Sequence, residues 1–336
     1  MRLEDIRLEP LLDTLRLEKI DDKIYFSSPI YKNRISNSRL GLLNPKQGGS
    51  PEKFFGGFTQ SFNPSFALGS AVHEQILQPH LFKLAEDTHK PTAKMGGMAD
   101  ELYDIYCQRE ITDEDIIEAS NRVEYYKGKM TPDRIAEVRT KCADYWEARS
   151  AYEFNLDETK DIRYLDYPML EKAKSCIESL QSNKLAMDLL HPKGLVEDPI
   201  SECEQAILLD VKATMPNGKE VILHLKAKLD NYTIDFETNT IKVNDVKTHG
   251  QMLNTFDESK VKYHYYREIA FYMYLLGLIA KHKYNMTNPK KQANYLVVST
   301  VPNFYSKVVS VPFVEIRKGF YEFQKLLRYS AYLMCY

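Results

Sequence analysis

The stretch of sequence that decides the fold is residues 220–248, EVILHLKAKLDNYTIDFETNTIKVNDVKT. Apolar side chains alternate with polar ones from Val221 to Leu229, with Ile222 the exception, which is the period of a β-strand with one buried face. Asp230 has the parity of the polar residues and follows the last apolar one. We therefore expect Asp230 to project from the polar face at the end of a strand.

The second half of this stretch, residues 241–248, predicts another strand. Asp245 and Lys247 are two residues apart and therefore share a face with the apolar residues that precede them. Two carboxylates and one lysine at the margin of an apolar surface are costly unless they are ion-paired or bound to a metal. The strand pattern alone leaves a structural ion pair and a metal site about equally open.

The segments on either side of this stretch predict an α/β fold. An Asn-Gly pair at 217–218 is typical of a tight hairpin turn to a preceding strand. Residues 98–190 are rich in helix signals and poor in strand signals. The other expected elements are helices at 8–17, 64–77, 263–283 and 314–332, and strands or extended pieces at 24–26, 199–214, 295–300 and 306–311. This order predicts a central mixed β-sheet flanked by helices, with a large helical insertion.

The composition limits the classes of protein that need to be considered. The 336-residue chain has a formal net charge of −2 and a pI near 6.5, so a nucleic-acid partner would need a local positive groove. The most apolar run, Ile269–Ala280, is shorter than the roughly 20 residues of a membrane span. The N-terminus lacks the apolar core of a signal peptide. We therefore expect a cytoplasmic protein with no membrane partner.

Several common kinds of site are not signalled. The five cysteines are widely spaced and form no C-x-x-C pair, which argues against a zinc or iron–sulfur site and suits a reducing compartment. The chain has no Walker-type phosphate loop and no G-x-S-x-G nucleophile elbow. These absences make a small-molecule hydrolase of those types a weak alternative.

The charged set at the two strand ends suits metal-assisted hydrolysis of a phosphodiester. A hard divalent cation generates hydroxide near neutral pH and neutralises charge on the phosphate, and Mg²⁺ prefers oxygen ligands. Asp230 and Asp245 can supply two carboxylate oxygens, and the carbonyl of Val246 can supply a third. Lys247 can orient the attacking water or stabilise the developing charge.

The Asp-x-Lys pattern is weak by itself, because the chain carries it elsewhere. Asp21-Asp22-Lys23 and Asp210-Val211-Lys212 have the same spacing, and Asp210 also lies in an expected strand. The set at 245–247 is preferred because a strand-terminal aspartate precedes it across a hairpin and a long helix follows it.

Several pieces of the chain, spanning residues 35–300, resemble the PD-(D/E)XK nuclease superfamily, closest to its RecB-like and phage-exonuclease branch. LKAKLD at 225–230 followed by VNDVKT at 243–248 is similar to the strand-terminal Asp and the D-x-K-T strand of that branch. Gly69–His73 resembles its G-x-x-x-H helix motif, and Tyr265–Tyr272 resembles its later Q-x-x-x-Y helix motif. Residues 35–40 resemble the extended N-terminal segment of the family.

The resemblance implies a role for each matched residue. The expected catalytic residues are Asp230, Asp245, Lys247 and an earlier acidic residue, for which Glu204 is preferred over Glu202. The expected metal ligands are His73, Asp230, Asp245 and Val246. The residues expected to bind DNA or to support the site are Arg267, Glu268, Tyr272 and Thr248. On its own, His73 would more often be an ordinary helix residue than a ligand.

This sequence also departs from the family pattern. Glu268 stands where the family has a glutamine, which removes an amide donor and adds an acceptor. Ala227 stands where a glycine is often found before the first aspartate, and the cysteine positions exclude the four-cysteine iron–sulfur variant. We expect one nuclease domain over 1–336, with an N-terminal extension at 1–62, a helical insertion at 95–195 and a catalytic β-meander and helix core at 196–336.

The resemblance implies a Mg²⁺-dependent DNA nuclease, with Mn²⁺ as a substitute ion. We expect an exonuclease of DNA recombination, repair or end processing, in bacterial or phage-infected host cytoplasm. Its partners would be DNA, a recombination or helicase protein, and further copies of itself. Two alternatives stay open: a structure- or sequence-specific endonuclease, and a catalytically inactive DNA-binding or assembly module on the same fold.

Overall fold

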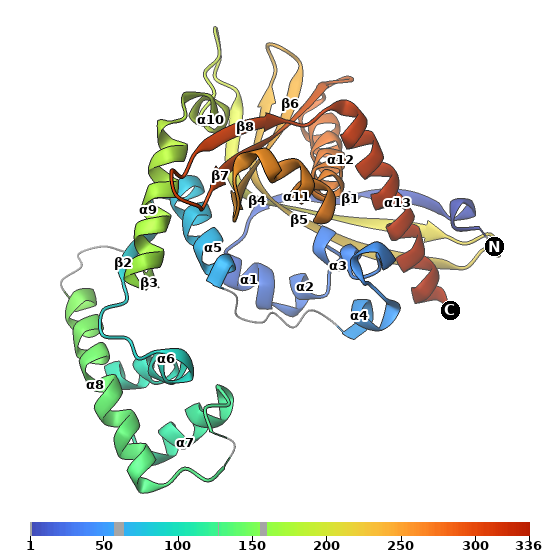
Figure 1. The fold of residues 1–336 in the computed structure, drawn as a ribbon. Helices are drawn as coiled ribbons and strands as arrows, with labels where there is room; N and C mark the ends of the chain where they lie inside the picture. Colours follow the sequence, from blue (N-terminus) through green and yellow to red (C-terminus); the bar gives the residue numbers. More distant parts are fainter. Residues whose placement is uncertain (1, 57–63, 127, 155–159) are drawn as a thin grey trace. The chain divides into compact units, whose positions relative to one another are not determined.

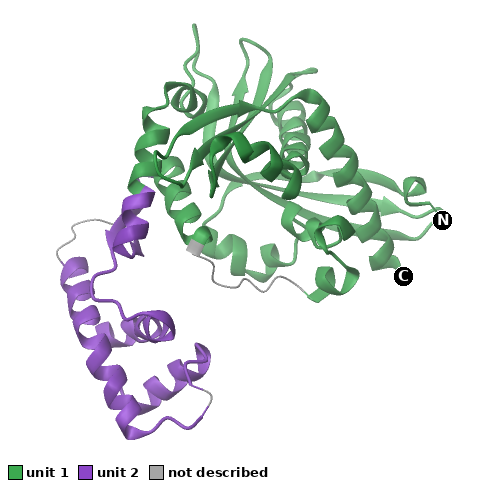
Figure 2. Cartoon of the chain, in the orientation of Figure 1, with its two compact units in different colours: residues 1–78, 174–336 green, residues 79–173 purple. Residues whose placement is uncertain are grey.

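The structure, a computed structural model, describes residues 2–56, 64–126, 128–154 and 160–336 (Figure 1). The chain divides into two compact units (Figure 2). Unit 1 comprises residues 1–78 and 174–336, and unit 2 comprises residues 79–173. The sequence places a helical insertion at 95–195, so the second unit begins and ends earlier than that range. The end of the expected 1–62 extension lies outside the described residues.

Unit 1 contains a six-stranded sheet with the order β1-β4-β5-β6-β7-β8. Neighbouring strands are antiparallel except β6 and β7, which are parallel. The strands are β1 (Arg7–Lys19), β4 (Ile200–Thr214), β5 (Glu220–Asp235), β6 (Thr240–His249), β7 (Lys290–Ser299) and β8 (Ser306–Ser310). The expected α/β class with a central mixed sheet flanked by helices is confirmed.

The helices of unit 1 come mainly from the two ends of the chain. The N-terminal ones are α1 (Asp22–Ser27), α2 (Pro29–Lys32), α3 (Asn37–Gly41), α4 (Pro51–Gly56) and α5 (Pro64–Leu77), with short 3₁₀ turns η1 (Leu3–Asp5) and η2 (Pro45–Gln47). The later ones are α9 (Tyr167–Ser182), whose first turns belong to unit 2, α10 (Lys184–Leu190), η3 (Leu253–Thr255), α11 (Phe256–Lys262), α12 (Tyr265–Tyr284) and α13 (Phe313–Cys335).

Alternating parity along β6 assigns the helices to the two faces of the sheet. Ile241 and Val243 belong to the main apolar core together with Phe271 of α12 and Phe323 of α13, whose rings are 4.9 Å apart. Residues of the other parity meet α5 and α10: Asn244 donates a hydrogen bond to the Leu189 carbonyl at 3.1 Å. Helices α12 and α13 therefore cover one face, and α5 and α10 lie against the other (Figure 1).

Helices α12 and α13 approach each other closely at a glycine. A Cβ atom added at Gly319 would lie 2.1 Å from the Tyr266 carbonyl oxygen, so only glycine fits there. Helix α12 also forms the crossover between the parallel strands β6 and β7. The expected long helix at 263–283 and the closing helix at 314–332 are thus both present, with slightly different ends.

Two predictions for the N-terminal region are wrong. The expected helix at 8–17 is the strand β1, and its leucines mimic helical spacing because the pairing of β1 with β4 shifts register between Leu11 and Arg16. The expected extended piece at 24–26 is part of helix α1, which the Asp21 side chain caps by accepting from the amides of Lys23 and Ile24.

The segment at 35–40 is extended only at its start. Ile35 bridges to Leu225 of β5, and helix α3 follows, capped by the Ser36 side chain. The expectation for residues 64–77 is confirmed, because α5 has those bounds. Among the described residues, no helix has both the length and the apolarity needed to cross a membrane.

Unit 2 is mostly helical, with its own small core. It contains α6 (Ala93–Gln108), α7 (Asp113–Arg122) and α8 (Pro132–Phe154). It also contains a parallel pair of short strands that the sequence did not indicate, β2 (Phe82–Glu86) and β3 (Asp161–Leu165). Trp146 is buried and donates to the Ala99 carbonyl at 2.9 Å, which fastens α8 to α6.

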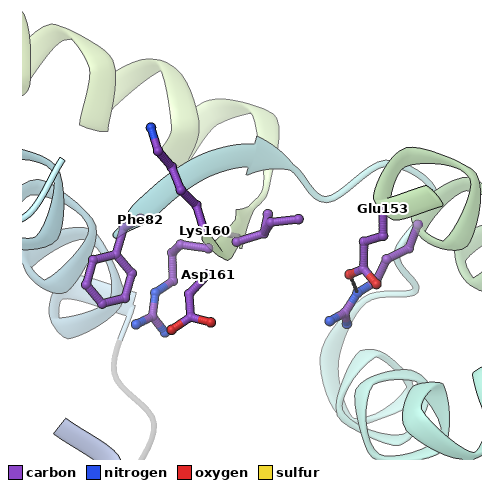
Figure 3. A pocket seen from close by; sticks show the side chains of 7 residues that line it. Phe82, Glu153, Lys160 and Asp161 are labelled. Atoms are coloured by element: carbon purple, nitrogen blue, oxygen red, sulfur yellow. Dashed lines mark hydrogen bonds and ion pairs between the residues drawn. The ribbon is translucent and has the colours of Figure 1, made fainter. Parts of the chain in front are cut away.

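A pocket in unit 2 lies between its strands and α8 (Figure 3). In this view Phe82, Lys160 and Asp161 stand apart from Glu153 across the opening. Glu153 is already engaged, because it accepts from Tyr103 and Tyr164 at 2.9 Å each and pairs with Arg149 at 3.0 Å. Two of the charged residues that line the pocket, Glu153 and Arg149, therefore neutralise each other.

Candidate metal centre and active site

The candidate site lies where two neighbouring strands separate. The last pair of the β5–β6 ladder is Asn231 with Asn244, whereas β6 stays paired with β7 as far as His249. In the part of β5 that is not paired with β6, Ile35 pairs with the strand edge, and its amide donates to the His224 carbonyl at 2.6 Å. Asp230, which the sequence placed at the end of a strand, instead lies inside β5, because this strand continues to Asp235. Asp230 and Asp245 stand where β5 and β6 separate and form a fork, and beyond it the two strands are no longer paired with each other.

The backbone of Val246 fills the fork. Its amide donates to Asp230 Oδ2 at 2.7 Å, and its carbonyl oxygen lies 2.6 Å from His73 Nε2. His73 Nε2 is also 3.4 Å from Asp230 Oδ2. Three of the four expected metal ligands therefore converge from α5, β5 and β6.

Helix α5 can come close to β6 because of a glycine. A Cβ atom at Gly69 would lie 3.2 Å from the Thr248 hydroxyl oxygen, which is a tight contact. His73 is one turn further along the same helix and reaches Val246. Gly69 and Thr248 therefore set the distance between helix and strand, and this is the contact that the structure gives to Thr248.

Glu204 forms a group of possible metal ligands together with His73 and Asp230. His73, Glu204 and Asp230 each offer one ligand atom, and these atoms lie within 4.8 Å of one another. Glu204 adopts a left-handed backbone conformation, φ +56°, which is strained for a residue other than glycine. Glu202 instead accepts from Gln205 at 2.8 Å. The geometry therefore separates the two glutamates that the sequence left as candidates.

Strand β5 changes faces at the same level. Leu229 and Tyr232 both belong to the main core although they are three positions apart, an odd offset, so the simple alternation is interrupted at Asp230. Just before the interruption Lys228 pairs with Glu204 at 2.9 Å and also contacts Asp22 of α1. Lys228 is a supporting residue that the sequence reasoning missed, although its polar parity next to Asp230 was visible.

The lysine of the Asp-x-Lys pair is held by two carboxylates. Lys247 Nζ lies 2.9 Å from Asp245 Oδ2 and 3.1 Å from Glu268 Oε2. The Tyr272 hydroxyl donates to the other oxygen of Glu268 at 3.2 Å. An ammonium group has three N–H donors, so one donor of Lys247 is left for a water or a phosphate oxygen.

The pKa shifts follow from burial and from these pairs. Burial raises the pKa of Asp245, and Asp230 and Glu268 add to the increase. Burial also opposes the charge on Lys247, but the carboxylates of Asp245 and Glu268 outweigh it and raise the pKa of this lysine well above its usual value. Lys247 therefore stays protonated and acts as a hydrogen-bond donor, not as a base.

Burial also shifts the pKa values of Glu204 and His73, because it disfavours the charged form of each group. It raises the pKa of Glu204, with Asp230 adding to the effect. For His73 burial lowers the pKa, yet the nearby carboxylates of Asp230 and Glu204 outweigh it and raise the pKa overall. The carboxylate of Asp230 therefore contributes to both shifts, although burial is the larger cause for Glu204.

The donor set fits a hard divalent cation. Five carboxyl groups face two lysines around the fork, so acidic groups are in excess; the carboxyl groups are those of Asp22, Glu204, Asp230, Asp245 and Glu268, and the lysines are Lys228 and Lys247. Asp245 Oδ2 is buried and, within the described residues, has no hydrogen-bond partner of good geometry. The nearest cation to this oxygen is the Lys247 ammonium, 2.9 Å away, so the case for a divalent ion rests on the acidic group of His73, Glu204 and Asp230.

Asp245 and Arg267 lie differently from the other expected site residues. The Asp245 carboxylate points to Lys247 and is not part of the group formed by His73, Glu204 and Asp230. Arg267 is 2% exposed and pairs with Glu322 of α13 at 2.9 Å, while also donating to Asn37 at 2.8 Å. Its side chain joins α12 to α13 and α3 and does not reach the surface.

The second Asp-x-Lys pattern in a strand, Asp210-Val211-Lys212, is explained by structural ion pairs. Its carboxylate pairs with Arg34 and with His224, each at 2.9 Å, on the opposite half of the sheet from the fork. Asp22, from the stretch Asp21-Asp22-Lys23, contacts Lys228. The preference for residues 245–247 therefore agrees with where the charged groups gather.

Comparisons with known proteins add little to this geometry. No family model matches the chain, and no curated protein matches it at a significant level. Among solved structures, a "putative exonuclease" from Eubacterium rectale is similar over 93% of this chain and 86% of that chain, with 10% identity and a TM-score of 0.46. At that level of similarity, the chemistry of this chain's own residues has to identify its function.

Proposed function

We propose that this protein is a divalent-metal-dependent nuclease that hydrolyses DNA phosphodiester bonds, on a fold of the PD-(D/E)XK type. The observation that carries the proposal is the fork between β5 and β6. There His73, Glu204 and Asp230 come within ligand distance of one another, beside the Val246 carbonyl. Excess negative charge at a phosphodiester site requires a cation, because the substrate is itself an anion.

Each residue has a task that its surroundings support. His73, Glu204, Asp230 and the Val246 carbonyl would hold Mg²⁺ or Mn²⁺, since carboxylate and carbonyl oxygens suit both ions. A bound ion supplies an activated water and neutralises charge on the phosphate.

The second half of the site would act directly on the reacting groups. Lys247 uses two of its donors on Asp245 and Glu268, so its free donor can hold the attacking water or a phosphate oxygen. Asp245 accepts from Lys247, whose ammonium group lies close to both of its carboxylate oxygens. Glu268 and Tyr272 position the lysine.

A degradation assay tests the proposal. Purified protein is incubated with end-labelled linear DNA and with covalently closed circular DNA, with Mg²⁺, with Mn²⁺ and with EDTA. We expect cleavage of the linear substrate that requires the metal and that is lost in Lys247→Ala and Asp245→Ala. Equal metal-dependent activity in all three proteins would reject the assignment of the site.

The same assay separates the alternatives within the proposal. An exonuclease, which we favour, leaves the closed circle intact, whereas an endonuclease cuts it. A module without catalytic activity would bind DNA without cleaving it, and calorimetry would then find no binding of Mg²⁺. The pairing of Lys247 with Glu268 keeps this last alternative worth measuring, because a glutamate here neutralises part of the lysine charge.

A further inference from the structure

A row of aromatic and basic side chains leads from Lys247 to the surface. Lys247 Nζ lies 5.0 Å from the centre of the Tyr265 ring. The rings of Tyr265 and Tyr263 are stacked, with centres 5.7 Å apart and planes 25° from parallel. Lys262 Nζ then lies 5.1 Å from the centre of the Tyr263 ring. The row thus begins at the candidate active site and ends at an exposed cation.

The backbone is strained to make this arrangement. Only two residues separate α11 from α12, and one of them, His264, has φ +54° and ψ +41°, which is a left-handed conformation. The His264 side chain is buried, 2.7 Å from Glu322 Oε1 and 2.8 Å from the Tyr266 hydroxyl. These contacts hold the turn in place, and the turn brings Tyr263 and Tyr265 together. Strain of this kind is often found at functional sites.

The outer tyrosine is too exposed to serve only as a core residue. Tyr263 is 50% exposed, while Tyr265 packs inward against Phe256 and Tyr295 with ring centres 6.1 Å away in each case. A rigid inner ring therefore supports an outer ring that is open to solvent. Aromatic side chains arranged in this way stack on nucleobases, and a neighbouring lysine suits the phosphate that follows each base.

We infer that Tyr263 and Tyr265 form a stacking platform for an unpaired nucleobase of the cleaved strand, with Lys262 contacting its backbone. The inference rests on the proposed nuclease function and sharpens it, because it makes an unpaired base part of the substrate that the site recognises. The substrate at the site is therefore a single-stranded segment or a frayed end of DNA. Tyr263 is a specificity residue, since it touches a base and not the reacting phosphate.

The test combines a change in the protein with a change in the DNA. Single-turnover cleavage of single-stranded oligonucleotides is measured for the wild type, Tyr263→Phe and Tyr263→Ala, with either intact bases or an abasic site at each position near the labelled end. We expect Tyr263→Ala to lose roughly 5- to 100-fold in kcat/KM on intact DNA, and Tyr263→Phe to retain most of it. At one abasic position the wild type should fall to the level of Tyr263→Ala.

Tyr321→Ala serves as the matched control, because Tyr321 is also exposed, at 65%, but lies on α13. It should cleave like the wild type. The inference is overturned if Tyr263→Ala cleaves intact DNA as fast as the wild type. It is also overturned if its loss is the same on intact and abasic DNA, or if Tyr263→Phe is as defective as Tyr263→Ala.

A binding arm keeps this result separate from the proposed function. Fluorescence anisotropy of a labelled single-stranded oligonucleotide is measured in EDTA for the same proteins. Binding that weakens in Tyr263→Ala, together with no cleavage by the wild type in Mg²⁺, would leave the platform standing and reject the nuclease. Cleavage by the wild type with no effect of Tyr263→Ala in either arm would reject the platform alone. A wild type that binds a second protein through this surface but no oligonucleotide would also reject it.

Discussion

The last rung of the β5–β6 ladder, which we call the paired end, and the fork that begins at the very next residues, which we call the forked end, bury polar groups in opposite ways. At the paired end, Asn231, Asn244 and Asn294 form a ladder of amides across three strands, with distances of 2.8 and 2.9 Å, and Ser310 extends it at 3.0 Å. At the forked end, the buried groups are carboxylates and lysines with an excess of negative charge.

The difference lies in whether the polar network is complete. The amide ladder is neutral and its members satisfy one another, so it fixes strand register without needing a ligand. The forked end has more carboxylates than lysines and raised carboxyl pKa values, so an added cation would stabilise it. A closed network serves the fold, whereas an open one of this charge suits a metal-dependent reaction.

The largest expected effect comes from Asp230→Asn at the forked end. The amide oxygen can still accept from the Val246 amide, so the backbone arrangement should survive, but one anionic ligand is lost. We expect cleavage of DNA to fall by on the order of 10³-fold, with no loss of stability in the absence of metal. Cleavage kinetics and urea unfolding of the same preparation check this. A variant that unfolds easily but cleaves normally when folded would break the comparison.

The next largest effect should come from Asn244→Leu at the paired end. It removes the donor to Asn231 and Leu189 and the acceptor for Asn294, so buried groups on both neighbouring strands lose partners. We expect a loss of about 2–4 kcal/mol in the free energy of unfolding, with little change in kcat.

Urea unfolding and cleavage at a temperature well below the transition measure both quantities for Asn244→Leu. Asn254→Ala, at an exposed position in η3, is the matched control and should be neutral in both. A large fall in kcat with unchanged stability would mean that the two ends are not separate in function.

A smaller effect should distinguish the ends by metal alone. At a Mg²⁺ concentration 100-fold above its Kd, binding to the folded state stabilises the protein by about 2.7 kcal/mol. We expect this gain in thermal melting of the wild type and of Asn244→Leu, but not of Asp230→Asn or His73→Ala. An equal gain in Asp230→Asn would place the ion elsewhere.

The smallest effect concerns Lys226, a buried lysine of β5 outside the fork. Burial, with Arg39 and Arg34 nearby, lowers its pKa to about 8. An unfolded lysine keeps its proton up to about pH 10.4, so between these values the unfolded chain binds more protons and this group makes stability rise with pH.

Lys226→Met should remove this rise. We expect the free energy of unfolding of the variant, relative to the wild type, to fall by about 1 kcal/mol between pH 7 and pH 10, after allowance for solvent screening. Chemical denaturation at both pH values measures the difference. Lys193→Met, at an exposed position, should show no such change, and a change of the opposite sign in Lys226→Met would contradict the burial argument.

The regular parts of the sheet were predictable because their sequence follows a simple period. The strands from 200 to 249, the Asn-Gly turn and the long helix α12 all have patterns that local sequence carries. Strand β1 was not predictable in that way. Its register shift between Leu11 and Arg16 breaks the period of two, and the leucines then imitate a helix.

The candidate site, like the sheet, has one part that could be predicted from the sequence and one part that could not. Asp230, Asp245 and Lys247 could be named from the sequence because each comes directly after alternating apolar residues of a strand pattern and together they resemble a known nuclease motif. The separation of β5 from β6, the strained backbone of Glu204 and the glycine contact that brings His73 to Val246 depend on residues far apart in the chain.

The sequence by itself thus determined which side chains could react, since strand parity and residue chemistry are local properties. Only the tertiary structure decided which of them meet, because a fork between strands and a stacked pair of tyrosines need partners from distant segments. Glu322 of α13 illustrates the reason: it holds both the strained turn at His264 and the buried Arg267, and nothing in the local sequence of either residue announces it.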